Sequence, residues 1–227
     1  MSSKQPRLKL TLTATAESIV RGGHPWVFAD SVRSQNREGL MGELTVIYDR
    51  KDKFLAVGLF DPDSPLRVRV LHAGKPTTLD DAWWRERLNA ALDRRAGIAD
   101  AQTNGLRLIN GESDGWPGLV LDRYDSTLVL KLYTAAWLGR LPMATGLISD
   151  ALAPARVVLR LSRNIHASGA AAGFRDGQII RGAPLEGVVT FLESGIRFES
   201  DVLRGQIAGQ PALGTRDQVA GGDDADA

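Results

Sequence analysis

Short apolar runs separated by turn residues occupy the first 75 positions, and this pattern limits the fold more than any other feature. The runs are LKLTLTA, PWVF, ELTVIYD, FLAVGLFD and LRVRVLHA, and the segments between them are RGG, REGLMG, RKDK and DPDSP. Such runs between clusters of Gly, Pro and Asp are typical of short β-strands joined by tight turns. We therefore predict a small β-barrel of about five strands over residues 1–75.

Positive charge is concentrated in the same region. Residues 1–75 contain 12 Lys and Arg against 8 Asp and Glu, residues 76–200 contain 14 of each, and residues 201–227 contain two Arg against five Asp. In the run LRVRVL, strict alternation predicts that Arg67 and Arg69 share one wet, positively charged face of a strand. A polyanion should therefore prefer this region, although an ordinary solvated face explains the surplus as well.

The sequence changes character after residue 75. A linker helix is predicted within residues 76–104, with Thr78 or Asp80 as its N-cap. One face of this helix would carry an apolar stripe made of Trp83 or Trp84, Leu88, Ala91 and Leu92. Strands are predicted at LRLI, GLVLDRY, TLVLKLY, RVVLRLS, GVVTFLES and IRFESDV, and a helix interrupted early by Pro142 at AAWLGRLPMATGLISDALA. These patterns predict an α+β central domain over residues 105–202, with no doubly wound alternation and no complete Rossmann domain.

Composition argues against several classes of protein. The chain has no cysteine, which excludes disulfides and thiolate metal sites, and His24, His72 and His166 have no metal-ligand spacing. The N-terminus lacks the apolar stretch of a signal peptide, and no segment approaches the roughly 20 apolar residues of a membrane span. We therefore expect a cytoplasmic protein that binds neither a membrane nor a metal.

Three motifs could carry chemistry, but each has a simpler explanation. In GESDGWPG, Glu112 and Asp114 could form a carboxylate pair, yet the composition favours a tight turn over a buried Trp116. GAAAG, residues 169–173, lacks the Lys-Ser/Thr of a phosphate loop and is interpreted as a flexible hairpin tip. His166 has no neighbouring nucleophile and is expected at the surface. No catalytic residue is predicted.

The stretch RGGHPWVF places flexible residues before rigid ones. Gly22 and Gly23 permit a sharp bend and a close approach by a ligand, and Pro25 sets the direction of the chain after it. The bend should hold Arg21 and His24 on the outside, with Trp26 and Phe28 as its anchors. A packed hairpin corner is the alternative explanation.

The segments HPWVF, LAVGLFDPDSPLRVRVL and LRLINGESDGWPGLVLDRY, together with Gly42, Glu43 and Asp49, resemble the PUA-domain class I S-adenosylmethionine-dependent methyltransferases. Well-known members of this family methylate cytosine at carbon 5 in large-subunit ribosomal RNA. The resemblance spans residues 8 to 206 and implies an N-terminal PUA domain that binds ribosomal RNA, and a homodimer. The resemblance implies that the bend binds RNA, which makes Arg21, Gly22, Gly23 and His24 candidate RNA-binding residues. The positive strand face adds Arg67 and Arg69.

The resemblance fails after DVLRGQ, residues 201–206. The family continues with Lys-Thr-Gly and an aromatic pair, where this chain has Ile207, Ala208, Gln210 and Pro211. The expectation is therefore a degenerate or disordered tail over residues 203–227 and a missing Rossmann-like catalytic domain. S-adenosylmethionine is then implied for the longer relatives and no cofactor for this chain.

Three origins of this tail remain open at this point: a frameshifted or truncated gene, a deliberately shortened chain, or a natural stand-alone RNA-binding protein. The abrupt loss of the family pattern favours the first. The expected function is that of an inactive fragment that binds ribosomal RNA at most. The alternatives are half of a split methyltransferase, with an apolar docking surface around Ile196, Phe198 and Val202, or a remnant without function.

Overall fold

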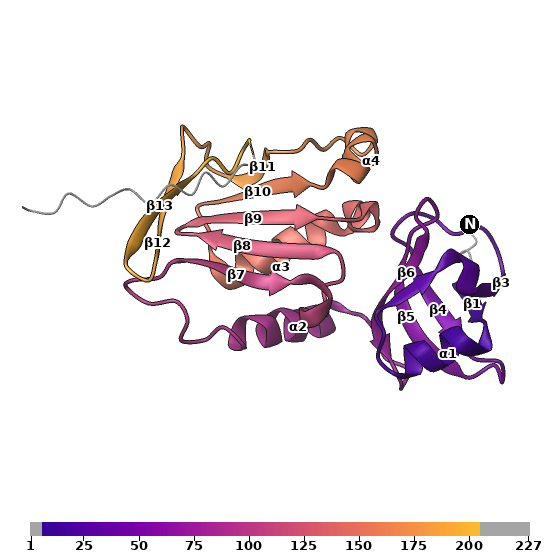
Figure 1. Ribbon diagram of the computed structural model, residues 1–227. Coiled ribbons are helices and arrows are strands. Elements are labelled where there is room, and N and C mark those ends of the chain that lie inside the picture. Colours follow the sequence, from indigo (N-terminus) through magenta and orange to yellow (C-terminus); the bar gives the residue numbers. More distant parts are fainter. Residues whose placement is uncertain (1–5, 205–227) are drawn as a thin grey trace, which may run out of the picture.

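The first unit of the fold is a six-stranded barrel (Figure 1). The computed structural model describes residues 6–204. The strands have the order β2-β6-β5-β4-β1-β3, and every pair is antiparallel except β1 with β4. The elements are β1 (Leu8–Leu12), α1 (Ala14–Arg21), β2 (Trp26–Phe28), η1 (Ala29–Ser31), β3 (Val32–Gln35), β4 (Leu44–Tyr48), β5 (Phe54–Phe60) and β6 (Leu66–Ala73).

The barrel core follows from the alternation of apolar residues along its strands. On β1, Leu8, Leu10 and Leu12 are fully buried, because alternate side chains of a strand point to one face. On β2 the inward residue is Val27, so Trp26 and Phe28 point outward and are 38% and 43% exposed. These two rings therefore do not fill the barrel core, and Trp26 contacts the bend through His24 instead.

Helix α2 (Asp81–Asp93) joins the barrel to the second unit. The carboxylate of Asp80 accepts a hydrogen bond from the Trp83 amide at 3.0 Å, which caps the first turn as predicted. Trp84 and Leu88, one turn apart, are buried on the face that meets the second sheet. None of the helices within residues 6–204 is long and apolar enough to cross a membrane.

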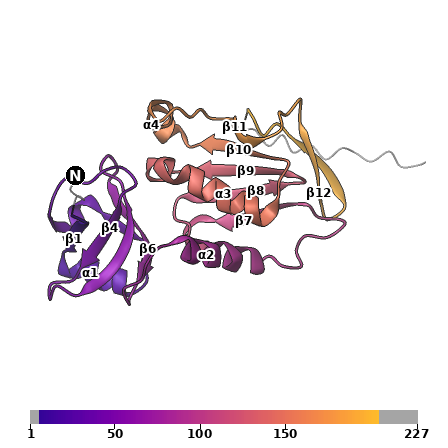
Figure 2. The same ribbon diagram turned by 180° about the vertical axis from the view of Figure 1, so that it is seen from behind.

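The second unit is a mixed five-stranded sheet with the order β11-β10-β9-β8-β7. Helix α3 covers its rear face in Figure 1 and lies in front of it in Figure 2. Sequence patterns missed β11, α4 and the short η1 and η4 segments. The elements are β7 (Gly105–Asn110), η2 (Gly111–Asp114), β8 (Leu119–Tyr124), β9 (Thr127–Leu132), η3 (Ala135–Arg140), α3 (Leu141–Leu152), β10 (Arg156–Leu161), η4 (Arg163–Ile165), α4 (His166–Ala171), β11 (Gln178–Gly182), β12 (Val189–Glu193) and β13 (Ile196–Ser200).

Strands β9 and β10 are parallel, with Thr127 opposite Arg156 at one end and Leu132 opposite Leu161 at the other. Helix α3 connects the two strands. The prediction that strand, helix and parallel strand do not alternate here is therefore wrong. It failed because an apolar run reveals a strand but not its direction. The predicted helix is divided near Pro142 into η3 and α3. Pro142 lies in the first turn of α3, where the missing N–H group is not needed.

Two further expectations about the second unit are corrected. Most of the GAAAG segment belongs to helix α4 and the turn after it, so it is not a hairpin tip, while His166 is exposed as expected. Hairpin β12–β13 packs against the other face of the sheet at the end far from the barrel (Figure 1). Val202 is only 4% exposed and Phe198 stacks on Phe191, so the apolar surface expected here is reduced to Ile196.

Direct contacts hold the barrel against the second unit. The buried Thr134 hydroxyl donates to an Asp61 carboxylate oxygen at 2.8 Å. Arg140 Nε donates to the Gly42 carbonyl at 3.2 Å. A Cβ atom placed on Gly42 would lie 2.3 Å from the Ala136 carbonyl oxygen. The two units are therefore packed at a close backbone approach that only glycine permits.

Gly42→Ala should destabilise the chain more than Gly74→Ala does. Both glycines have positive φ, +73° and +101°, but no atom lies within 4 Å of a Cβ on Gly74. Gly74→Ala should cost about 1–3 kcal/mol of backbone strain alone. Gly42→Ala adds the clash at the junction, so urea unfolding should show a larger decrease in stability. Equal decreases would mean that the junction relaxes around the added methyl group.

Candidate nucleic-acid interface

The chain bends sharply at the end of α1, where glycine was predicted to act. The amides of Gly22 and Gly23 donate to the Ser18 and Val20 carbonyls, both at 3.0 Å. Gly23 has φ +93°, a conformation that other residues resist, whereas Gly22 has an ordinary helical φ of −73°. Glycine is therefore required by conformation at position 23 only, and both positions are open to solvent.

Arg21 is half exposed at this bend and is held by one carboxylate. Its Nη2 lies 2.5 Å from Asp49 Oδ2. The backbone amides of Lys53 and Lys51 also donate to Asp49, each at 2.9 Å. These bonds, led by that from the Lys53 amide and joined by Arg21, outweigh desolvation and lower the pKa of Asp49 below its ordinary value.

Asp49 also holds the loop that carries Lys51 and Lys53 next to the bend. Lys51 and Lys53 are exposed, and their loop is tied to Asp49 beside Arg21. Sequence reasoning treated RKDK as a turn only, although its three cations within four residues were a usable signal. We name Arg21, His24, Lys51 and Lys53 the basic bend.

His24 connects the bend to strand β2. Its ring is exposed, lies edge-on to the Trp26 ring at 5.8 Å, and places Nδ1 3.3 Å from the Trp26 amide. Trp26 in turn is the cross-strand neighbour of Arg69 on β6. The bend and Arg69 are therefore adjacent through Trp26.

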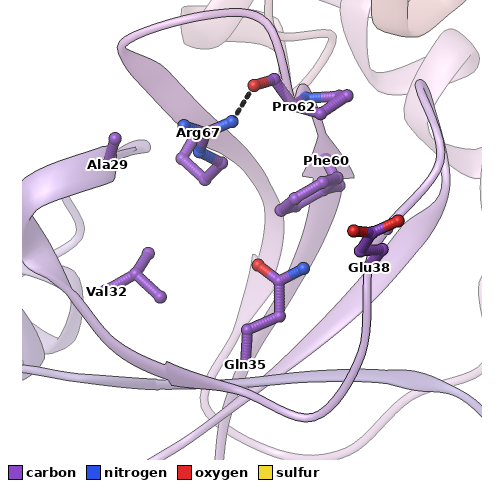
Figure 3. A pocket seen from close by; sticks show the side chains of 8 residues that line it. Ala29, Val32, Gln35, Glu38, Phe60, Pro62 and Arg67 are labelled. Atoms are coloured by element: carbon purple, nitrogen blue, oxygen red, sulfur yellow. Dashed lines mark hydrogen bonds between the residues drawn. The ribbon is translucent and has the colours of Figure 1, made fainter.

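Arg67 lies elsewhere, in a shallow pocket of about 460 Å³ on the barrel (Figure 3). Its guanidinium donates to the carbonyls of Pro62 and Asp61 and lies 5.8 Å from the Phe60 ring centre. Gln35 and Glu38 line the same pocket. Its charge is thus partly satisfied within the barrel.

The expectation of one wet, positive face for Arg67 and Arg69 is therefore wrong. Arg69 points toward the second unit, where a Cβ on Gly118 would lie 3.0 Å from Arg69 Nε. Burial lowers the pKa of Arg69, against the opposing attraction of Asp61 and Glu112. The second unit covers this part of β6, which alternation within one strand cannot reveal.

A recess of about 550 Å³ lies between the two units. We name it the interdomain recess. Trp26 of the barrel and Glu112 of the second unit both line it, and Trp26 Nε1 donates to Glu112 Oε1 at 2.9 Å. Arg107 Nη1 donates to Asn110 Oδ1 at 3.1 Å, and Arg107 Nε donates to Asp122 at 2.8 Å. The polar and aromatic side chains that line the recess include those of Trp26, Arg69, Arg107, Asn110, Glu112 and Tyr133.

The GESDGWPG segment is a structural turn, as the composition favoured. Asp114 is buried and contacts Arg94 and Arg95, each at 2.6 Å, and accepts from the Asn110 amide. Trp116 is fully buried beneath the turn. Asp114 is thus occupied by ion pairs while Glu112 faces Trp26, and the two carboxylates do not form an acid and base pair. Over the described part of the chain, no cluster of three or more metal-ligating side chains is found.

Sequence comparisons place the chain beside known methyltransferases. The profile of the PUA-like domain family matches residues 10–73. Ribosomal RNA large subunit methyltransferase of Deinococcus radiodurans is 55% identical over 213 residues, which are 92% of this chain and 52% of that protein. Ribosomal RNA large subunit methyltransferase I of Enterobacter sp. (strain 638) is 38% identical over 129 residues, which are 56% of this chain and 33% of that protein.

The chain therefore contains a PUA-like domain and is homologous to large-subunit ribosomal RNA methyltransferases. It spans about half the length of the first of these relatives and a third of the second.

Comparison with solved structures corrects the predicted fold class. A protein described as a SAM-dependent methyltransferase from Streptococcus mutans matches with a TM-score of 0.69 and 16% identity, over 84% of this chain and 47% of that chain. A methyltransferase structure complexed with SAH matches with a TM-score of 0.70 at the same identity and coverage. The described residues thus share their fold with 47% of each of these methyltransferase chains, and the expected α+β class without a complete Rossmann domain is overturned.

The same matches give no support to a missing catalytic domain or to an inactive, truncated chain. Residues 205–227, on which most of the predicted tail falls, lie outside the described residues.

Asp114 should make the stability of the chain depend on acid pH. Desolvation raises the pKa of Asp114. Hydrogen bonds from Arg95, the Asn110 amide and Arg94 together lower it by more, so the pKa lies below the ordinary value. This stabilisation is complete above an ordinary aspartate pKa of about 4 and is lost as pH falls through the lowered pKa of the folded state.

Asp114→Asn should therefore flatten the acid limb of unfolding free energy against pH. At neutral pH it should cost about 3 kcal/mol, near the lower end for a broken buried pair, because Arg94 is 57% exposed. Asp150→Asn, at an exposed position of α3, is the matched control and should leave the limb unchanged. An acid limb in Asp114→Asn identical to that of the unmodified chain would contradict the assignment.

Proposed function

We propose that this chain acts in the S-adenosylmethionine-dependent methylation of large-subunit ribosomal RNA, and that its barrel binds the RNA. The observation that carries the proposal is the 55% identity with the Deinococcus radiodurans methyltransferase over 92% of this chain. The PUA-like match over residues 10–73 supports the part of the proposal that concerns RNA binding.

The basic bend is the surface of the barrel best suited to the phosphate backbone. Lys51 and Lys53 are exposed cations, and Arg21 adds a half-exposed guanidinium beside them. Gly22 and Gly23 have no side chain and are exposed, so an RNA backbone can approach the main chain closely. Shape and phosphate contacts of this kind are how structured RNA is recognised.

Arg67 and Arg69 have different parts in this proposal. Arg67 donates to two carbonyls of its own unit, so it contributes to the positive field near the barrel more than to direct contacts. Arg69 faces the interdomain recess, and its RNA contact is proposed there.

The methyl donor is proposed from the neighbours, one of which was solved with SAH. Nucleotide-type cofactors lie at the carboxyl ends of parallel strands, with a glycine-rich turn after one strand and a carboxylate about 20 residues on. Here β9 continues into Tyr133 and Thr134, and β10 into Ser162 and Arg163. These residues do not fit the donor, so no step of methyl transfer is derived from them.

Lys51→Gln combined with Lys53→Gln should weaken binding to large-subunit ribosomal RNA. It should also reduce the slope of log affinity against log salt by roughly one for each phosphate group that the variant no longer neutralises. Arg85→Gln, at an exposed position on α2, removes a charge far from the basic bend and is the control. Filter binding over a series of salt concentrations measures both quantities, and equal slopes for the two variants would refute the role of the bend.

A further inference from the structure

We propose that the interdomain recess binds one unpaired nucleotide of the RNA, with its base stacked on the rings of Trp26 and Tyr133. This inference rests on the proposed function, because it assigns the form of RNA that the chain recognises. It adds a second contact region to the basic bend, and it involves residues of both units.

The recess lies where the barrel meets one end of the second sheet. Strands β7 and β9 both finish at this end, and the barrel stands directly opposite (Figure 1). Trp26 and Arg69 come from the barrel, whereas Asn110, Glu112 and Tyr133 come from the ends of β7 and β9. At about 550 Å³ the recess has the size of a small-molecule site, which suits a single nucleotide and not a helix.

Both aromatic rings are exposed and held in place. Trp26 is 38% exposed and Tyr133 is 41% exposed. Glu112 accepts the Trp26 indole N–H at 2.9 Å, and Lys131 lies 4.9 Å from the Tyr133 ring centre. Exposed, positioned aromatic rings beside cations are the means by which proteins stack single-stranded bases.

Arg69 places the positive charge of its guanidinium in the wall of the recess. Its Nε and Nη1 are enclosed and have no hydrogen-bond partner among residues 6–204. Because these two atoms have almost no accessible surface, a ligand in the recess meets the charge of the guanidinium without bonding to them. That charge attracts the phosphate oxygens of a nucleotide, and it is only weakly screened because Arg69 is partly buried in the wall of the recess.

The remaining groups favour a whole nucleotide over a bare phosphate. Glu112 places a carboxylate in the recess, which would repel a second anion but accepts hydrogen bonds from the amino groups of a base. Asn110 offers an amide beside it, held by Arg107. Cation, carboxylate, amide and aromatic rings together match the mixed chemistry of a nucleotide.

Tyr133→Ala and Trp26→Ala should each weaken binding of single-stranded RNA by roughly 5- to 100-fold, the effect of removing the stacking on one base. The probe is a labelled single strand of about ten nucleotides, within the usual site size, compared with its duplex by fluorescence anisotropy of the full 227-residue chain. Duplex binding should be unchanged.

Three variants separate stacking from other effects. Phe28→Ala removes an equally exposed ring from the same strand, outside the recess, and should have no effect. Tyr133→Phe and Trp26→Phe keep an aromatic ring and should retain most of the affinity. Unchanged duplex binding by the alanine variants themselves shows that their weaker single-strand binding does not come from misfolding.

The outcomes distinguish this inference from the proposed function. Normal single-strand binding by both alanine variants, with ribosomal RNA still bound through the basic bend, would overturn the recess assignment alone. Equal decreases in affinity for Phe28→Ala and Tyr133→Ala would overturn it as well, because the effect would not be specific to the recess. Failure of the unmodified chain to bind any RNA would overturn both.

Discussion

The packing of Trp84, Trp116 and Trp137 is the interaction on which the rest of the structure depends. Their ring centres are 5.1–5.6 Å apart, and all three are almost fully buried. Trp84 comes from α2, Trp116 from the turn before β8, and Trp137 from η3. The cluster therefore joins the linker helix to the two loops that form the sheet edge facing the barrel, and it positions the groups of the interdomain recess.

The strand ends that face the barrel explain why residues of both units form one surface. Thr134 follows β9 directly and bonds to Asp61 of the barrel, while Glu112 follows β7 and accepts from Trp26. The barrel thus stands at the end of the sheet where β7 and β9, the strands on either side of β8, finish (Figure 1). Polar and aromatic residues from both units converge there, and the basic bend lies next to them through His24.

Sequence reasoning succeeded where a signal was local. The cap at Asp80, the buried stripe of α2 and the turn over Trp116 each depend on residues within a few positions of one another. It failed where partners were distant. Arg69 is covered by Gly118, 49 positions further along the chain, and no pattern within β6 indicates that cover.

The division between what the chain encodes locally and what folding adds has a physical cause. Propensity, capping and alternation act over a few residues, so strands, helices and the conformation of Gly23 follow from neighbouring residues alone. Strand direction in the second sheet depends on contacts between distant segments, and so does the outward position of Trp26. The same holds for the position of the loop of Lys51 and Lys53, whose backbone amides bond to Asp49 beside Arg21. Such contacts exist only after the chain has packed, because it is packing that brings those groups within reach of one another.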